Sequence, residues 1–572
     1  MRISPQVHMA SRIHRNQLQQ LLYVVFCVVT ACAVTAPLPH RGQTMRSHPL
    51  YYILYHTARS ITIPGRPSAA FRMTGRPRPA GQNRDYPALV SHMIVAEKRG
   101  EGMPLSSFAA AAAAAVSAVT DFLWGPAMCC VFVLVGVYLS VGTGFFQLRK
   151  FGLWLRLTIG SLFVRKGGTG AARDKNSISP FQALATALAA TTGTGNIVGV
   201  ATAIVSGGPG AVFWMWISAF FGMMTKYAEI ALSMKYRYRN AAGEWMGGPM
   251  VFLERGIGRR WLAVLFSVFC LLASFGIGNM SQANSVSGAL ASGFGVPAWA
   301  TGAAIVLLCG TVMLGGIRRI GAVAEKIVPF MAVLYILGGL TIIAVNYRGV
   351  LPAFRDIFAG AFGLRAAGGG VLGYTVASSM RYGVARGIFS NEAGLGSSAI
   401  AHCATRTREP VRQAMWGVFE VFVDTIVVCT ITARCLLVTG VVGTPDGEGG
   451  LLTGAALTIR AFSHGLGRYA GAFVSVSIAL FAFTSILGWY HYGERSYSYL
   501  FGARGRGAYK AVYLAAAFAG CIVNLELVWS VSDIFNGLMA LPNLLGVVLL
   551  SGQVFSMTRR FLRRNGPRPP SD

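Results

Sequence analysis

The sequence predicts an all-α polytopic membrane protein with eleven transmembrane helices. Of its 572 residues, 54% are hydrophobic and only 12% are charged, and the mean hydropathy is +0.53. A soluble domain has about 25% charged residues. Apolar runs of about 20 residues, long enough to cross the hydrocarbon core of a bilayer, recur from residue 120 onward. The chain is therefore expected to lie in a membrane, and not to be a soluble domain.

The apolar runs give the expected helices in order. The predicted spans are 122–147, 179–206, 210–234, 261–290, 296–316, 327–345, 383–403, 411–440, 470–490, 509–528 and 533–556. The first is an extra helix, and the other ten form two blocks of five, at 179–345 and 383–556. Because five is an odd number, the second block enters the membrane in the opposite orientation. The sequence thus predicts an inverted repeat.

The cationic residues alternate between loops, which predicts the orientation. The odd-numbered loops and the C-terminal tail 562–572 are rich in Lys and Arg, whereas the second, fourth and tenth loops have none. Cytoplasmic loops carry such an excess, so the odd loops and the C-terminus are expected in the cytoplasm. The sixth loop also holds arginines, and its length leaves room for an interfacial helix. The formal net charge of +30 then reflects loops facing anionic lipid, with no nucleic-acid partner.

Residues 1–120 do not fit this scheme. They carry 13 Lys and Arg against three acidic residues, and an apolar stretch at 21–36 resembles a signal anchor or signal peptide. Alternatively, translation starts downstream, for example at Met93 or Met103, and we favour this interpretation. Pro, Gly, Arg and Ser dominate 63–86, which predicts disorder. The transporter domain is expected over 121–561.

Two predicted spans are interrupted at matching places in the two blocks. In 179–206 the interruption is the run TTGTGN at 191–196, and in 383–403 it is SNEAGLGSS at 390–398. Both runs are poor in helix formers. Backbone groups freed at membrane depth cannot face lipid, so such segments line a cavity or bind something. Half-helix N-termini suit a carboxylate, and carbonyls and hydroxyls suit sodium. Small residues such as Gly195 and Gly199 are also typical of close helix packing, but two matched clusters with Asn and Thr favour a binding site.

The run GGPGAVFWMWISAFFG at 207–222 closely resembles the signature of the sodium:alanine symporter family, the alanine or glycine:cation symporters. The motifs TTGTGNIVGVA, GNMSQANS, GIFSNEAGLGSSAIAH and TSILGWYHYGE resemble other stretches of that family, and together they extend from about Asp121 to Phe561. The resemblance implies a LeuT-type core of ten helices after one extra helix. It also implies sodium-driven uptake of alanine or glycine. We further expect a monomer in the cell membrane, with no cofactor besides the coupling ion.

The resemblance also implies the substrate site. The residues that match the family's contact positions are Thr192, Gly193, Gln282, Asn391, Ser485 and Trp489. Gln282 offers donors and an acceptor without the desolvation cost of a buried charge. Trp489 is a rigid apolar wall that would favour small substrates, since one methylene in such a pocket is worth roughly 1–3 kcal/mol. From its position alone, Trp489 is equally typical of an interfacial belt.

Sodium candidates are the backbone carbonyls around the first interruption together with two hydroxyls on the ninth span. The set is Ala190, Thr191, Gly193, Thr484 and Ser485. Each hydroxyl alone is a weak signal, because Ser and Thr in membrane helices often bond back to their own backbone.

Acidic residues inside apolar spans are functional candidates, because burying a charge in a membrane is costly. Asp424 lies deepest, and Glu392 lies beside the second interruption. Either could bind sodium or carry a proton. For Asp424 we favour a pair with Arg386 or Arg434, and for Glu392 a site role is as plausible as pairing. Three further acids, Glu229, Glu420 and Glu494, are expected nearer span ends in gate or loop pairs.

Three other functions compete with sodium symport. A proton-coupled amino-acid or amine transporter would keep the same fold. A channel needs a continuous pore, commonly from oligomer symmetry, and the inverted repeat argues against it. An enzyme would need a nucleophile motif, a phosphate loop or a metal-ligand cluster, and the sequence offers none of these.

Overall fold

The computed structural model describes residues 118–163, 177–363, 376–447, 449–523 and 526–565, and for 526–531 and 565 it describes only the backbone. The chain divides into two units, Met1–Val119 and Thr120–Asp572. Every contact given below lies within the second unit. The predicted extension 1–120, including 21–36, lies almost wholly outside the described residues, as do the last residues of the tail 562–572.

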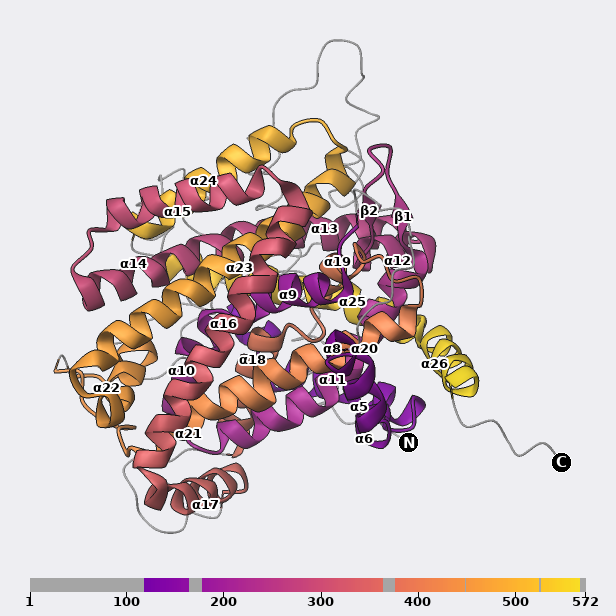
Figure 1. The fold of residues 1–572 in the computed structure, drawn as a ribbon. Helices are drawn as coiled ribbons and strands as arrows, with labels where there is room; N and C mark the ends of the chain where they lie inside the picture. The colour runs from indigo at the N-terminus through magenta and orange to yellow at the C-terminus, as the bar shows by residue number, and fades with distance from the viewer. Residues whose placement is uncertain (1–117, 164–176, 364–375, 448, 524–525, 566–572) are drawn as a thin grey trace, which may run out of the picture. The chain divides into compact units, whose positions relative to one another are not determined.

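The described part of the second unit consists of helices and one short hairpin (Figure 1). The helices up to the middle of the chain are α5 (Pro126–Gly142), α6 (Phe146–Arg149), α7 (Phe151–Leu157), α8 (Gly160–Phe163), α9 (Pro180–Thr191), α10 (Val198–Gly207), α11 (Ala211–Tyr236), α12 (Pro249–Arg255), α13 (Arg260–Phe275), α14 (Ser281–Phe294), α15 (Ala298–Met313) and α16 (Gly316–Val345). The remaining helices are α17 (Val350–Ala361), α18 (Val376–Asn391), α19 (Ser398–His402), α20 (Pro410–Val421), α21 (Thr430–Val438), α22 (Gly454–Leu466), α23 (Ala470–Phe501), α24 (Arg506–Ile522), α25 (Glu526–Leu549) and α26 (Ser551–Asn565).

Six helical stretches of the described residues are long and apolar enough to cross a membrane. They are Ala118–Gly142, Arg260–Phe294, Gly316–Val345, Pro410–Val438, Gly454–Phe501 and Ser532–Leu549. The helical, multi-pass class is therefore confirmed. The count of eleven spans stays a prediction, because several predicted spans are divided into shorter helices.

The first predicted interruption is confirmed. The helix α9 begins with a capping box, in which the Ser179 hydroxyl accepts from the Gln182 backbone N–H and the Gln182 amide oxygen accepts from the Ser179 N–H, both at 3.0 Å. It ends at Thr191, a 3₁₀ turn covers Thr194–Asn196, and α10 begins at Val198. The chain therefore leaves the α-helical path between two helices that would otherwise form one span.

The second interruption is also confirmed. The helix α18 ends at Asn391 and α19 begins at Ser398. Three residues between them have left-handed backbone, namely Glu392 at φ 55°, Gly394 at φ 100° and Gly396 at φ 78°. Glycine adopts such angles freely, whereas Glu392 is a non-glycine residue in a region that L-residues disfavour. The sequence therefore fixes a sharp local change of direction here.

Several helix boundaries differ from the predicted ones, and the two largest shifts are in α16 and α23. The helix α16 begins at Gly316 instead of 327, and α23 continues to Phe501 instead of 490. The predicted spans followed hydropathy and left charged residues such as Arg319 and Arg495 outside. Arginine is a good helix former, so each helix continues past its apolar run. The short helix α17 lies in the predicted sixth loop, where the sequence left room for it.

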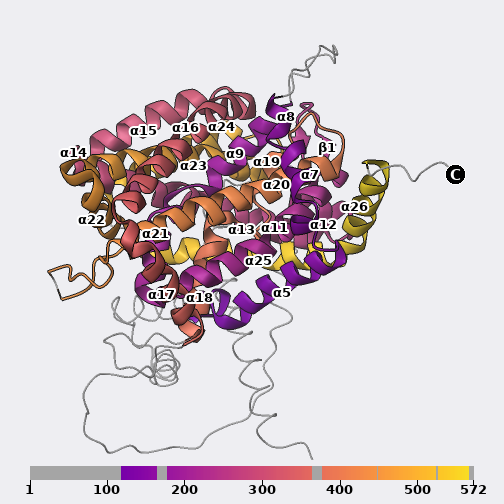
Figure 2. The same ribbon diagram turned by 60° about the horizontal axis from the view of Figure 1, so that its bottom comes forward.

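The broken helices lie among long continuous ones (Figures 1 and 2). The helix α9 packs on α16 and α23, α10 packs on α18, and α11 packs on both α18 and α20. The α13–α14 pair packs on α23, and its two members are joined by a π-helical segment at Gly276–Met280. A second π-helical segment, Phe422–Cys429, joins α20 to α21. Such segments are rare in proteins as a whole, and those that occur are often at functional sites.

Candidate functional site

The first interruption contacts two of the predicted substrate residues. The Gln282 side-chain oxygen accepts from the Thr194 backbone N–H at 3.4 Å, and the Gln282 amide nitrogen donates to the Ile277 carbonyl at 3.1 Å. A Cβ atom placed on Gly193 would lie 2.6 Å from the Ser485 hydroxyl oxygen and 3.3 Å from the Gln282 side-chain oxygen. The structure thus brings Gly193, Gln282 and Ser485 together from three different helical segments.

Trp489 and Ala190 extend this cluster. A Cβ on Gly278 would lie 2.3 Å from the Cβ of Trp489, so the tryptophan packs directly on the π-helical segment that precedes Gln282. A Cβ on Gly488 would lie 2.7 Å from the Cβ of Ala190. The Ser485 hydroxyl donates to the Ala190 carbonyl at 3.4 Å. The missing side chains at these two glycines are what allow α23 to approach both neighbours.

The hydroxyls of two predicted sodium residues form no hydrogen bond to this cluster among the described residues, although the Thr191 carbonyl accepts from the Gly193 N–H at 3.0 Å. The Thr191 hydroxyl donates to the Ala187 carbonyl of its own helix at 3.2 Å. The Thr484 hydroxyl donates to the Phe481 carbonyl at 2.9 Å and lies 3.6 Å from the sulfur of Met331 on α16. Both hydroxyls therefore bond back along their helices, as such residues often do in membranes. Thr192 is buried at the C-terminus of α9, where its N–H donates to the Leu188 carbonyl at 2.7 Å.

Asn391 lies at the second interruption and bonds to another helix. Its side-chain nitrogen donates to the Thr425 hydroxyl at 3.0 Å, and its side-chain oxygen accepts from the Ala393 N–H at 2.9 Å. A Cβ on Gly195 would lie 3.5 Å from the Cα of Ser390. The two interruptions therefore touch at Gly195 and Ser390, while the Asn391 side chain is directed to the π-helical segment.

The favoured pairing for Asp424 is wrong. Asp424 is fully buried, and the ion pairs found among the described residues do not include it. Neutral groups donate to it instead, namely the Asn196 amide at 2.8 Å, the Ser390 hydroxyl at 2.7 Å and the Thr425 hydroxyl at 3.0 Å. Asn196 and Ser390 lie within the two predicted interruptions but were given no role there. Their positions inside the two matched polar runs were the sequence signal that could have identified them.

Glu229 and Glu420, which were expected nearer span ends in gate or loop pairs, are both fully buried. The Glu420 carboxylate lies 3.3 Å from the Lys226 ammonium and 3.1 Å from Nε2 of His402. Lys226 also donates to the Ser398 hydroxyl at 2.7 Å. Glu420 on α20 is therefore paired with a cation of α11, a partner that the sequence analysis did not name.

Glu229 fastens the second interruption to two continuous helices. One of its carboxylate oxygens accepts from the Gly394 backbone N–H at 2.9 Å and from the Asn543 side chain on α25 at 2.7 Å. Asn543 also donates to the Gly394 carbonyl at 2.9 Å. Glu392 is buried, and the Ser397 hydroxyl donates to its carboxylate. Side chains thus satisfy backbone groups that the helix no longer satisfies, as a membrane interior requires.

Comparison with known proteins decides the family. The model of the sodium:alanine symporter family matches residues 109–568. The chain belongs to the sodium:alanine symporter family. Its relatives include the sodium/alanine symporter AgcS of Methanococcus maripaludis, 46% identical over 458 residues, which covers 79% of this chain and 98% of the relative. An uncharacterized transporter of Haemophilus influenzae is 46% identical over 452 residues (78% and 96%). The probable sodium/glutamine symporter GlnT of Bacillus subtilis is 38% identical over 451 residues (78% and 90%). The protein is therefore a membrane transporter and not an enzyme.

In this member of the symporter family, the odd-numbered loops meet on one face. The Trp245 side chain donates to the Ser177 hydroxyl at 3.0 Å, and Ile178 pairs with the 404–406 segment through two backbone hydrogen bonds at 3.1 and 2.9 Å. The Arg237 guanidinium donates to three carbonyls of that same region, those of Cys403, Thr405 and Thr407, at 2.6–2.7 Å. The first, third and seventh loops are thus tied together.

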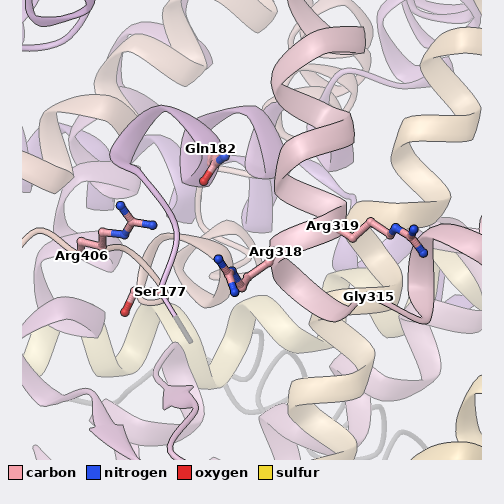
Figure 3. A pocket seen from close by; sticks show the side chains of 6 residues that line it. All are labelled: Ser177, Gln182, Gly315, Arg318, Arg319 and Arg406. Atoms are coloured by element: carbon pink, nitrogen blue, oxygen red, sulfur yellow. The ribbon is translucent and has the colours of Figure 1, made fainter. Parts of the chain in front are cut away.

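Two cavities lie at this face, and none of the predicted substrate or sodium residues lines either of them. The larger, about 350 Å³, is lined by Ser177, Gln182, Gly315, Arg318, Arg319 and Arg406. Figure 3 shows the Arg318 and Arg406 side chains on either side of Ser177, and the Arg319 side chain pointing away from these two arginines. The smaller, about 110 Å³, shares Gly315 and Arg318 and reaches His491 and Arg495 on α23. The cavities therefore belong to the loop face of the symporter.

The hairpin β1 (Tyr238–Arg239) and β2 (Trp245–Met246) holds Glu244 against α23. Its carboxylate forms a bidentate pair with Arg495, at 2.9 and 3.1 Å, and lies 2.8 Å from the Arg506 guanidinium. Burial alone would raise the pKa of Glu244, but the hydrogen bonds and charge of Arg495, with Arg506, hold it well below its usual range. An unperturbed Glu titrates near pH 4.3. The pair therefore stabilises this face above that pH and is lost only under more acidic conditions.

Proposed function

We propose that this chain is a sodium-coupled symporter that carries a small neutral amino acid, alanine or glycine, into the cell by alternating access. Support comes from the family, from AgcS, whose name gives sodium and alanine, and from the geometry of the first interruption. The observation that carries the proposal is the meeting of Gly193, Gln282 and Ser485 at a place where α9 has already ended. Peptide groups, a neutral amide and a hydroxyl suit a zwitterion and a hard cation.

The proposed substrate site consists of Thr192, Gly193, Gln282, Asn391, Ser485 and Trp489. Gln282 and the peptide groups of the interruption would bind the charged ends of the amino acid, and Trp489 would limit the size of its side chain. Sodium would lie against the carbonyls of 190–193 with the hydroxyls of Ser485 and Thr484. Since the Thr484 hydroxyl bonds to its own helix, its participation requires a change of rotamer.

The proposed architecture is a LeuT-type inverted repeat of five plus five helices after one extra helix. Repeat one is 179–345 and repeat two is 383–556, and the chain acts as a monomer in the cell membrane. The loop face described above is proposed to be cytoplasmic, with the C-terminus on the same side, because cationic loops stay in the cytoplasm. The tied loops would then close the substrate path on the cytoplasmic side.

Labelled-alanine uptake into proteoliposomes tests the proposed function. Uptake is expected to accumulate alanine only when sodium is higher outside, and to fail when choline replaces sodium. Unlabelled glycine and alanine are expected to compete, whereas leucine and phenylalanine are not, since each added methylene costs roughly 1–3 kcal/mol in a rigid pocket. Uptake that followed a pH gradient without sodium would contradict the proposal, and so would flux far above a slow carrier turnover.

The Glu244–Arg495 pair is expected to hold the cytoplasmic side closed. Glu244→Gln removes the charge but keeps the size, so the hairpin should separate from α23 more often. Charged hydrogen bonds of this kind are worth about 1.5–3 kcal/mol. Cys403 is buried and packs against Gly247 of the same hairpin region. Its modification by a maleimide, mapped by mass spectrometry, should therefore become several-fold faster.

The matched control is Glu254→Gln. Glu254 is an acid near the same face, where it accepts from the Tyr499 hydroxyl at 2.9 Å and lies 3.8 Å from Arg260. This variant is expected to leave the labelling of Cys403 unchanged. Because the pKa of Glu244 is depressed, wild-type labelling should not rise between pH 8 and pH 6 beyond the change in maleimide reactivity. Equal labelling of Cys403 in Glu244→Gln and in wild type would show that the Glu244–Arg495 pair does not keep the cytoplasmic side closed.

A further inference from the structure

The π-helical segment Phe422–Cys429 brings two polar residues against both interruptions. An extra residue per turn shifts side chains relative to a regular helix, and here Asp424 and Thr425 are the residues that it presents. Asp424 contacts Asn196 of the first interruption and Ser390 of the second, and Thr425 contacts Asn391. One turn of one helix thus reaches both unwound segments.

The contacts of Asp424 continue to the predicted substrate site. Its Oδ1 accepts from the Asn196 amide nitrogen at 2.8 Å, and its backbone carbonyl accepts from the same nitrogen at 3.1 Å. The Asn196 side-chain oxygen in turn accepts from the Gly193 N–H at 3.0 Å. The Thr432 hydroxyl donates a hydrogen bond to the Asn196 backbone carbonyl at 2.8 Å. Asn196 is therefore fixed at both ends, and Asp424 is one step from the Gly193 peptide.

The charge of Asp424 is costly where it lies. The carboxylate is fully buried, its donors are neutral, and no ion pair among the described residues includes it. Burying an ionisable group costs several kcal/mol unless other groups satisfy it, and acids at such depth are functional candidates. Both carboxylate oxygens already accept hydrogen bonds from the two interruptions. The Asp424 carboxylate is therefore better suited to link the two interruptions than to bind an ion directly.

We propose that Asp424 is a positioning residue of the transport site, which ties the first interruption, through Asn196, to the second, through Ser390. The carboxylate keeps the Gly193 peptide and the start of the second interruption in the mutual geometry that binds cation and amino acid. This assignment rests on the proposed function and adds to it the residue that couples its two halves.

We call the hydrogen bonds from Asp424 to Asn196 and to Ser390 the bridge. The test exchanges the side chains of Asp424 and Asn196. Asp424→Asn leaves an amide facing the Asn196 amide, so the link weakens. We expect the half-saturating concentrations of sodium and of alanine to rise by about tenfold or more, as loss of a charged hydrogen bond does. The double variant Asn196→Asp/Asp424→Asn places the carboxylate on the other side and restores a donor opposite it. It is expected to return both concentrations to within about threefold of wild type.

A second readout needs no transport. In hydrogen exchange on the purified protein, Asp424→Asn should speed exchange of the amides in 190–196 and 388–398 by about tenfold or more, and the double variant should slow it again. The control is Thr458→Val, which removes a buried hydroxyl that donates to the Gly454 carbonyl of its own helix. It is expected to change neither segment.

Exchange at wild-type rates in Asp424→Asn would overturn the assignment, and so would a double variant as impaired as the single one. The second result would mean that the carboxylate must stand at 424 itself, as an ion ligand would. Should Asp424→Asn not fold, Ser390→Ala removes one end of the bridge without touching the charge, and wild-type exchange there would overturn the assignment too. Absence of sodium-dependent uptake in the wild type would contradict the proposed function but not the role of Asp424. Hydrogen exchange measures the link between the two interruptions without any transport.

Discussion

Gly193→Ala is expected to lower sodium-driven alanine uptake by roughly 10- to 100-fold. The added methyl would stand 2.6 Å from the Ser485 hydroxyl oxygen and 3.3 Å from the Gln282 side-chain oxygen. At 2.6 Å something must move, and overpacking of this kind costs about 1–3 kcal/mol, where 1.4 kcal/mol is a tenfold change in an equilibrium. The φ of Gly193 is −126°, so the expected loss comes from the contact and not from backbone strain. Uptake of labelled alanine at saturating sodium measures it.

The control for Gly193→Ala is Gly199→Ala on α10, where an added Cβ meets nothing within 4 Å. That variant is expected to transport like wild type and to gain slightly in stability from the higher helix propensity of alanine. Wild-type uptake in Gly193→Ala would exclude the close approach of Ser485 and Gln282 from the site.

Lys226→Met is expected to cause the largest loss of stability. Lys226 is fully buried, 3.3 Å from the Glu420 carboxylate and 2.7 Å from the Ser398 hydroxyl. Methionine would fit the space but leave Glu420 without its cation. Removing one partner of a buried pair costs about 3–5 kcal/mol. Thermal unfolding of the detergent-solubilised protein, followed by size-exclusion chromatography after heating, should show a clear decrease in the midpoint.

Two companion variants make this result specific. Lys226→Met/Glu420→Gln removes both charges, and a large part of the lost stability should return, because a neutral pair leaves no uncompensated charge. Lys235→Met, on the same helix, removes an exposed lysine that donates to Gln553, and should shift the midpoint little. A double variant less stable than Lys226→Met would contradict the explanation by charge.

Much of the fold could be predicted from composition and periodicity. The two interruptions were visible because Thr, Gly and Asn disrupt an apolar helical pattern at 191–196, and Gly394 and Gly396 do so in the second. The ends of α16 and α23 were not predictable from hydropathy, because Arg319 and Arg495 end an apolar run without ending a helix. The π-helical segments left no signal in the sequence pattern, since they depend on packing between helices.

The candidate site was only partly predictable. Residues carried by a motif could be assigned one by one, and Gln282 and Ser485 do lie beside Gly193. Partner choice could not be predicted, because it depends on which helices become neighbours. Asp424 therefore seemed to need an arginine, whereas the fold surrounds it with Asn196, Ser390 and Thr425. Likewise, a gate or loop pair was expected for Glu420, but its partner Lys226 on α11 could not be named from the sequence.

The ties across the odd-loop face have a kinetic consequence. Ser177 and Ile178 immediately precede α9, and they are held by Trp245 and by the 404–406 segment, which Arg237 holds in turn. Because each loop supplies a partner to the next, an outward movement of one loop breaks hydrogen bonds to the others. If the loops part during transport, as proposed above, we expect several bonds to break together, so that cooling slows the turnover more steeply than it slows simple diffusion.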